Sequence, residues 1–253
     1  MNGLMMEMPL LVSSLIVHAD RHHGDVEIVS RRVEGDIHRY TYREAHARSR
    51  QLANALERLG AKRGDRIASL AWNGHRHFEL FYAVGGAGMV MHTVNPRLFP
   101  EQIAWIINDA EDAWLFIDST FLPLIERLRP QLTALKGVVL MTDRAHWPTS
   151  TTLTDLLCFE ELVAAEKSDY RWPELDENTA CGLCYTSGTT GNPKGALYSN
   201  RSNVLPRLLM SSIPATPVIS WISSAVKRLP LQISCSKSGL VTNRHSLRRS
   251  PFF

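Results

Sequence analysis

The chain has 253 residues, a formal net charge of +3, and 44% apolar and 21% charged residues, which is ordinary for a folded protein in water. The positive charge belongs to the end of the chain, because residues 206–253 contain seven Lys or Arg and no Asp or Glu. The acidic remainder argues against a body built to bind nucleic acid.

The cysteines, at positions 158, 181, 184 and 235, do not suggest a disulfide framework in a chain of this length. We therefore expect a reducing, cytoplasmic location, with peripheral attachment to a membrane as a variant of it. Cys181 and Cys184 have the spacing of a redox pair or of half a zinc site, but there is no second pair. Because both lie in a strand-like apolar run, we expect two packed strand cysteines.

No segment meets the requirements of a signal peptide or of a membrane span. Residues 9–17 are apolar, but Glu7 precedes them and the first basic residue is Arg21. The nearest candidate for a span, residues 208–226, lacks charges but contains Pro214 and Pro217. Since a bilayer needs about 20 uninterrupted apolar residues, we expect no integral membrane span.

The predicted elements alternate between helices and strands. An amphipathic helix over 5–19 comes first, and a hairpin of strands 26–33 and 37–41 follows. Thr41 and Glu44 form a capping box that opens a helix, which Gly60 ends. Further strands are predicted at 66–72, 89–94, 113–117, 138–141 and 181–185, and further helices at 75–83, 100–107, 121–128 and 159–165. This alternation is typical of βαβ units, so the fold class is α/β, with a mostly parallel sheet and helices on both faces.

The stretch from Tyr185 to Gly195 reads YTSGTTGNPKG and directly follows an apolar strand. Ligands of parallel sheets lie beyond the carboxyl ends of the strands. The glycines let the backbone approach a ligand, the hydroxyls can donate hydrogen bonds, and Lys194 adds a mobile positive charge. These groups suit a polyphosphate, with each charge-assisted bond worth about 1.5–3 kcal/mol. The alternative is a solvated turn, but the length and order of the motif favour a phosphate loop.

The loop is not of the Walker A type, because Gly-x-x-x-x-Gly-Lys-[Ser/Thr] does not occur. It resembles the phosphate-binding signature of the adenylate-forming superfamily, which includes acyl-CoA synthetases, luciferases and peptide-synthetase adenylation domains. Four other segments are also similar to acyl-CoA synthetases, above all to medium- and long-chain fatty-acid–CoA ligases: Tyr40–Glu44, Leu59–Ala68, Asn95–Leu98 and Ala196–Asn200. The resemblance runs from near residue 5 to about Leu205.

The resemblance implies the large N-terminal domain of an adenylate-forming enzyme. It implies that the β- and γ-phosphates of ATP, with Mg²⁺, are held by Thr186, Ser187, Gly188, Thr189, Thr190, Gly191 and Lys194. In the family reaction a carboxylate attacks the α-phosphate of ATP, giving an acyl-adenylate and pyrophosphate, and the thiol of CoA then displaces AMP. The implied substrates are a fatty acid, ATP and CoA, and phosphate positioning with charge neutralisation is the main catalytic device. Neither acyl-chain length nor oligomeric state follows from the sequence.

The resemblance stops after Leu205, where Pro206 is expected to break a helix capped by Asn200. The family's adenine-side motif with its glutamate, its ribose-binding aspartate and its catalytic lysine have no match, so no catalytic residue is assigned. We expect a partial AMP-binding domain at 1–205. We expect residues 206–253 to be an irregular, non-homologous tail that is disordered or read out of frame. A chain of this kind is expected to be inactive as a ligase on its own.

Two other functions stay open. One is a short nucleotide-binding module that uses the loop without ligase turnover, and the other is a membrane-associated protein anchored by residues 208–226. A serine hydrolase is disfavoured, because no Gly-x-Ser-x-Gly motif occurs. His75, His77 and His92 have no carboxylate at ligand spacing on the same face, so we expect packed or surface histidines and no metal site.

Overall fold

The computed structural model describes residues 8–186 and 192–211. The helices of this part are α1 (Val12–His23), α2 (Tyr42–Arg58), α3 (His75–Gly86), α4 (Pro100–Asp109), α5 (Leu122–Leu128), α6 (Phe159–Ala164) and α7 (Asn200–Ser211). The strands are β1 (Glu27–Arg31), β2 (Ile37–Thr41), β3 (Arg66–Leu70), β4 (Val90–Thr93), β5 (Trp114–Ile117), β6 (Gly137–Leu140), β7 (Leu156–Cys158), β8 (Ala180–Thr186) and β9 (Lys194–Ser199).

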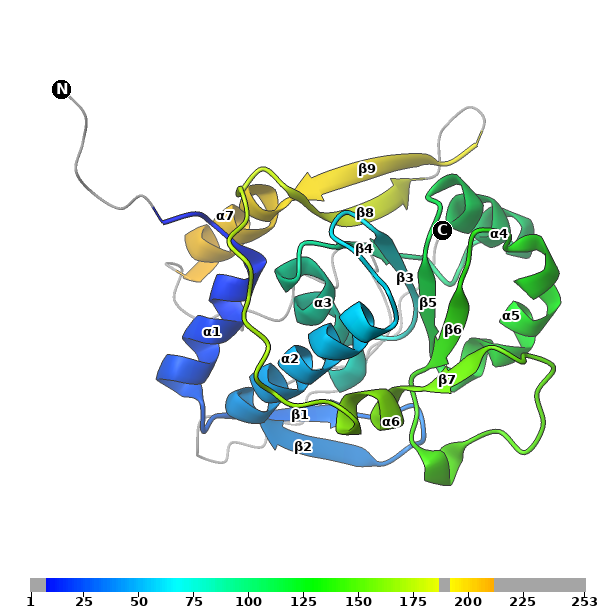
Figure 1. Cartoon of the computed structure of the whole chain (residues 1–253), viewed down its shortest axis with the longest axis horizontal. Helices are drawn as coiled ribbons and strands as arrows, with labels where there is room; N and C mark the ends of the chain where they lie inside the picture. Colours follow the sequence, from blue (N-terminus) through cyan, green and yellow to red (C-terminus); the bar gives the residue numbers. More distant parts are fainter. Residues whose placement is uncertain (1–7, 187–191, 212–253) are drawn as a thin grey trace, which may run out of the picture.

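The main sheet has seven strands in the order β7-β6-β5-β3-β4-β8-β9 (Figure 1). All neighbouring pairs are parallel except β8 and β9, which form an antiparallel hairpin at one edge. Strands β5 and β6 are buried along their whole length, as expected for parallel strands covered on both faces. The predicted α/β class with a mostly parallel sheet is therefore confirmed.

Helices cover both faces of this sheet. On one face, Leu56 of α2, Leu80 of α3 and Phe159 of α6 share a core with the inward side chains of β3, β4 and β5. On the other face, Ile103 of α4 and Ile125 of α5 share a second core with alternate residues of the same sheet. The two cores explain why the predicted helical periodicity was readable from the sequence, since each helix buries one apolar stripe.

The small β1–β2 hairpin stands apart from the main sheet and pairs antiparallel, with Glu27 opposite Thr41. It leads directly into α2, where the predicted capping box is present: Glu44 N–H donates to Thr41 Oγ1, and Thr41 N–H donates to the Glu44 carboxylate at 2.6 Å. Gly60, with a φ of +76°, follows the end of α2, a backbone conformation that glycine adopts at little cost.

The prediction that Pro206 breaks the last helix is wrong, because α7 continues through Pro206 to Ser211. A proline removes one helical N–H donor and costs about 3 kcal/mol. Packing of the helix offsets this cost, since Val204, at the start of its second turn, is buried with Val12 and Cys181. The cap also differs from the prediction, because Ser199 Oγ accepts the Ser202 N–H at 3.1 Å.

Two smaller differences concern the predicted elements. The first helix begins at Val12 rather than at residue 5 and ends at His23, and residues 1–7 lie outside the described ranges. Strand β7 was not predicted, because three residues carry too short an apolar pattern. Within the described ranges, no helix is long and apolar enough to cross a bilayer. Most of the 208–226 segment lies outside those ranges.

Candidate functional site

The β8–β9 hairpin carries the predicted phosphate loop at its open end. Thr186 is the last residue of β8, Lys194 is the first residue of β9, and the two are paired across the hairpin. Thr186 Oγ1 donates to the Lys194 carbonyl oxygen at 3.5 Å. The remaining predicted phosphate ligands, Ser187, Gly188, Thr189, Thr190 and Gly191, lie outside the described residues. The loop therefore starts at the carboxyl end of a parallel strand, which is where a ligand of such a sheet is expected.

The two described residues of the predicted site are both accessible. Thr186 and Lys194 are exposed. Within the described ranges, the Lys194 side chain makes no ion pair or hydrogen bond, so it is free to neutralise an anion. Gly195 follows, and a Cβ there would lie 3.1 Å from Leu183 and 3.2 Å from the Tyr185 ring. This glycine lets β9 pack closely against the residue that precedes the loop.

Tyr185 is held firmly at the base of the loop. Its hydroxyl donates to Asp109 Oδ2 at the end of α4, at 2.6 Å. Its ring lies 5.1 Å from that of His92 and 6.1 Å from that of Trp105. Burial and the bond to Asp109 both raise the pKa of the phenol, so Tyr185 stays neutral and acts as a donor. The start of the loop is thus tied to both β4 and α4.

A buried histidine–aspartate pair joins β4 to the segment between α4 and β5. His92 Nδ1 is 2.6 Å from Asp112 Oδ2, and both side chains are completely buried. Burial raises the pKa of Asp112, and His92 opposes this rise. His75, His77 and His92 are all buried, which confirms that they are packed. Their partners were not predicted, because the sequence gives no spacing rule for Asp112 or Glu160, which approach from separate segments.

The two strand cysteines have separate partners. Cys181 is buried, and its Sγ accepts from Asn203 Nδ2 at 3.2 Å. Cys184 is half-buried, and its Sγ is 3.1 Å from Thr93 Oγ1. These contacts are in keeping with the prediction that both are packed strand residues.

A cavity of about 350 Å³ lies at the carboxyl ends of β3 and β5. In the sheet, β4 separates these two strands from β8 and the predicted phosphate loop. It is bordered by Trp72 after β3 and by Asp118 after β5. Since α3 and α5 follow these strands on opposite faces, this crevice is a topological switch point, where α/β proteins commonly bind ligands. Asp118 is buried, its Oδ2 accepts the Trp72 N–H at 2.6 Å, and burial raises its pKa to about 7.

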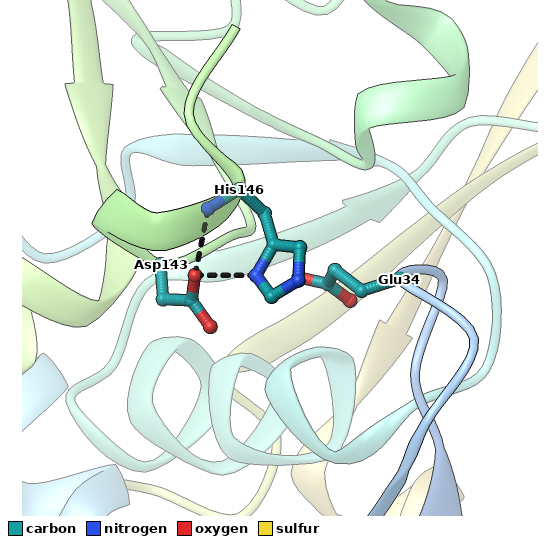
Figure 2. Close-up of side chains that lie close together, drawn as sticks. All are labelled: Glu34, Asp143 and His146. Carbon is teal, nitrogen blue, oxygen red and sulfur yellow. Dashed lines mark hydrogen bonds and ion pairs between the residues drawn. The ribbon is translucent and has the colours of Figure 1, made fainter.

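Beside this cavity, one group within the described ranges has the composition and spacing of a metal site. It comprises Glu34 from the β1–β2 turn, with Asp143 and His146 from the segment after β6 (Figure 2). One ligand atom of each lies within 4.8 Å of the others. No local motif in the sequence indicated this group, because Glu34 is far along the chain from the other two.

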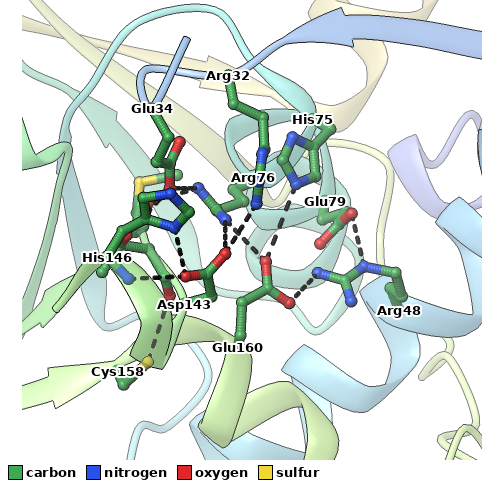
Figure 3. A network of polar contacts seen from close by, with 12 residues as sticks. Arg32, Glu34, Arg48, His75, Arg76, Glu79, Asp143, His146, Cys158 and Glu160 are labelled. Atoms are coloured by element: carbon green, nitrogen blue, oxygen red, sulfur yellow. Dashed lines mark hydrogen bonds and ion pairs between the residues drawn. The ribbon is translucent and has the colours of Figure 1, made fainter. Parts of the chain in front are cut away.

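A network of arginines and carboxylates connects this group to the helices (Figure 3). Arg76 Nη1 donates to Glu34 Oε1 and Arg76 Nε donates to Glu160 Oε1, each at 2.7 Å. Arg48 bridges Glu160 to Glu79. Burial alone would raise the pKa of Glu160, but its contacts with His75 and the two arginines hold that pKa well below its usual range. Burial raises the pKa of Glu79 to about 7 in spite of Arg48. The network joins the hairpin, α2, α3 and α6 into one unit.

The parallel sheet, with a glycine- and hydroxyl-rich loop after β8, matches one class of protein in sequence as well as in shape. The profile described as "AMP-binding enzyme" matches residues 16–225, so the chain belongs to the AMP-binding enzyme family. Its relatives include a 3-methylmercaptopropionyl-CoA ligase of Ruegeria lacuscaerulensis, 52% identical over 81% of this chain and 38% of the relative. A medium-chain-fatty-acid–CoA ligase of Ectopseudomonas oleovorans is 45% identical over 91% of this chain and 42% of the relative.

Solved structures agree on the fold. The anthranilate–CoA ligase AuaEII in complex with anthranoyl-AMP superposes with a TM-score of 0.69 at 22% identity, over 82% of this chain and 38% of that one. ATP-bound MatB from Rhodopseudomonas palustris superposes with a TM-score of 0.62 at 20% identity, over 81% of this chain and 38% of MatB. The chain thus spans about two fifths of the length of the relatives and structures that it matches, and corresponds to their N-terminal portion.

Proposed function

We propose that this chain carries the ATP-phosphate site of an ATP-dependent fatty-acid–CoA ligase. The observation that supports this most directly is Lys194, exposed and without an ionic partner in the described ranges, at the mouth of a hairpin whose first strand ends the parallel sheet. Family membership supports an acid–thiol ligase class. The acyl substrate is a proposal, because the relatives named above include ligases for both 3-methylmercaptopropionate and medium-chain fatty acids.

The proposed roles follow from the chemistry of the loop. Lys194 neutralises charge on the β- and γ-phosphates, and the hydroxyls of Thr186, Ser187, Thr189 and Thr190 donate to phosphate oxygens. Gly188 and Gly191 let the backbone N–H groups approach the same oxygens. Mg²⁺, when bound with ATP, offsets further phosphate charge. The ties of Tyr185 to α4 and β4 hold in place the end of β8, which carries Thr186, the first of these donors.

The first test is nucleotide binding by the purified chain, measured by calorimetry with Mg²⁺-ATP. Lys194→Ala should weaken ATP binding by about 10- to 100-fold, because a charge-assisted bond is worth about 1.5–3 kcal/mol. Lys167→Ala is the matched control, since Lys167 is also exposed but follows α6 and is not part of the hairpin. Equal ATP affinity in all three proteins would contradict the assignment of the loop.

A second candidate function is a nucleotide-binding module that uses the loop without ligase turnover. The exposed Lys194 at the base of the loop suits this function equally well. Exchange of labelled pyrophosphate into ATP separates the two functions. Exchange above background with fatty acids, and its dependence on chain length, would support the ligase, and ATP binding without exchange would support the module. Omitting the acid from the assay gives the background.

We also propose that the ligase domain of this chain ends near residue 205 and that residues 206–253 are read out of frame. The loss of acidic residues and of periodicity after Leu205 supports this boundary. The family match continues to residue 225, so the boundary needs a direct test. Sequencing the encoding DNA and translating every frame beyond the codon for Leu205 provides it. A second frame that continues with adenine, ribose and lysine motifs is the expected result, and no such frame would contradict it.

A further inference from the structure

Glu34, Asp143 and His146 meet where the turn of the β1–β2 hairpin approaches the edge of the main sheet (Figure 2). Glu34 lies in the turn between β1 and β2, and His146 ends a short 3₁₀ helix, η3 (Arg144–His146), that follows β6. Asp143 caps this helix and accepts the His146 backbone N–H at 3.0 Å. The group therefore joins two segments that do not share a strand pair.

The imidazole of His146 is oriented by Asp143. His146 Nδ1 is 2.6 Å from Asp143 Oδ1, so Nδ1–H donates to the carboxylate when the ring is neutral. This tautomer leaves a lone pair on Nε2. The second ring nitrogen faces the carboxylate of Glu34 in Figure 2. A carboxylate that fixes a histidine through its other nitrogen is the usual outer-shell arrangement of metal-binding histidines.

The carboxylate of Glu34 is incompletely satisfied. Its Oε1 accepts from Arg76 Nη1 at 2.7 Å and from Thr142 Oγ1 at 3.0 Å. The side chain is only 4% exposed. Its Oε2 is buried and has no hydrogen-bond partner among the described residues. A buried acceptor without a partner is costly. One carboxylate oxygen of Glu34 and one ring nitrogen of His146 lie within 4.8 Å of each other, and a positive ion between the two side chains would be stabilised by both.

The net charge around the group of Glu34, Asp143 and His146 is compatible with a bound cation. Arg32, Arg48 and Arg76 share the carboxyl groups of Glu34, Asp36, Glu79, Asp143 and Glu160. Arg32 Nη1 donates to Asp143 Oδ2 at 2.9 Å, which leaves Asp143 Oδ1 for His146, and Arg76 Nη1 donates to Glu34 Oε1. With the carboxyls ionised, the cluster carries more negative than positive charge. The nearby guanidinium groups weaken cation binding, so we expect moderate rather than tight affinity.

We propose that the Glu34 carboxylate and His146 Nε2 bind a divalent transition-metal ion of the Zn²⁺ type, with Asp143 as the positioning residue of His146 and water at the remaining positions. An imidazole nitrogen with a carboxylate oxygen favours Zn²⁺, Co²⁺ or Ni²⁺ over Mg²⁺ and Ca²⁺. Metal bonds of about 2.0–2.2 Å require the two donors to close together. His146 can move to do so, because it is 44% exposed on a surface turn.

Such an ion would clip the β1–β2 hairpin to the segment after β6. Binding to the folded state alone stabilises a protein by mass action, so the ion should raise the melting temperature in a saturable way. The inference is independent of the phosphate loop and of the proposed ligase function. It concerns a structural ion, distinct from any Mg²⁺ that accompanies ATP.

The surface of α1 offers a competing place for metal. His18 and His22 lie one turn apart on the helix, and their ring centroids are 4.5 Å apart, a spacing that can bind transition metals. The experiment therefore uses the full chain with His22→Ala as its background. Zn²⁺ alone is titrated in calorimetry, and Co²⁺ is used for its visible absorption, which reports nitrogen and oxygen ligation.

In that background we expect one saturable Zn²⁺ site, a Co²⁺ absorption band and a rise in melting temperature. His146→Ala should lower Zn²⁺ affinity at least 10-fold and abolish the band, and Asp143→Asn should lower the affinity about 10- to 100-fold. Glu34→Gln should act like His146→Ala, with circular dichroism to check folding. Absence of binding at millimolar Zn²⁺, or binding unchanged by His146→Ala, would overturn the proposal. A stability that depends on pH but not on Zn²⁺ would show a proton in place of the ion and would also overturn it.

Discussion

Asp118→Asn isolates the effect of a buried carboxyl group on stability. Asp118 is 6% exposed, borders the cavity at the switch point, and accepts the Trp72 N–H at 2.6 Å through Oδ2. None of the ion pairs in the described ranges involves it. An asparagine has the same shape and can accept the same N–H through its amide oxygen. The substitution therefore removes the charge and keeps the packing and the hydrogen bond.

The direction of the pKa shift of Asp118 determines how the free energy of unfolding depends on pH. Burial raises the pKa of Asp118 from 3.8 in the unfolded chain to about 7 in the folded protein. The folded state thus binds more protons than the unfolded state between these values, so the free energy of unfolding contributed by Asp118 falls as pH rises through this window. Each pKa unit corresponds to about 1.4 kcal/mol, which gives a loss of about 4 kcal/mol by pH 8. The Asp118→Asn variant escapes this loss, because an asparagine side chain does not titrate.

Urea denaturation of both proteins at several pH values between about 4 and 8 measures the difference. We expect equal stability near pH 4 and a more stable variant, by about 4 kcal/mol, near pH 8. The control is Asp36→Asn, because bonds from Arg32 lower the pKa of Asp36 below 3.8, so the Asp36 contribution to stability is complete above about pH 4. The difference in stability between this variant and the parent protein should therefore stay constant from about pH 4 to 8. A pH-independent difference between Asp118→Asn and the parent protein would refute the reasoning.

Two further substitutions test close packing and the base of the loop. Gly86→Ala should lower the free energy of unfolding by about 1–3 kcal/mol, because a Cβ there would lie 2.7 Å from the Trp172 ring. Gly85→Ala, whose Cβ would meet nothing closer than 3.6 Å, should be neutral or stabilising in the same urea titration, and an equal loss in both would contradict the steric argument. Tyr185→Phe removes the bond to Asp109 and should cost about 1 kcal/mol, measured by thermal unfolding. Tyr198→Phe, on the exposed face of β9, should cost nothing, and equal melting temperatures of all three proteins would refute the anchoring role.

The elements that were predicted well are those in which local pattern and tertiary packing agree. Helix α2, which Thr41 caps, has a capping box, a regular apolar stripe and a glycine just beyond its end, and the structure shows all three. Pro206 was misjudged, because a propensity rule took no account of Val204, whose burial holds the helix in place. The short strand β7 could not be found by periodicity, since it gains its partner β6 only when the sheet forms.

The functional features divide in the same way. The phosphate loop is contiguous in sequence, so its residue types and order could be recognised before its place in the fold was known. The switch-point cavity and the group of Glu34, Asp143 and His146 draw residues from separate segments. The sequence does not indicate which of these residues come together. Their proximity depends on the strand order, in which β4 and β5 lie on opposite sides of β3.

The strand order also bears on how the chain reaches its native state. Strand β8, which leads into the loop, pairs with β4, so that Met91 lies opposite Gly182. Strands β3 and β4, in contrast, are joined by a single helix and pair Ile67 with Met91. The chain between β4 and β8 is longer than the chain between β3 and β4. Pairing β8 with β4 therefore loses more conformational entropy before stabilising contacts form. On this argument we expect the β3–α3–β4 unit to form early and the β8–β9 hairpin, which carries the predicted phosphate loop, to dock late on the edge of a sheet that already exists.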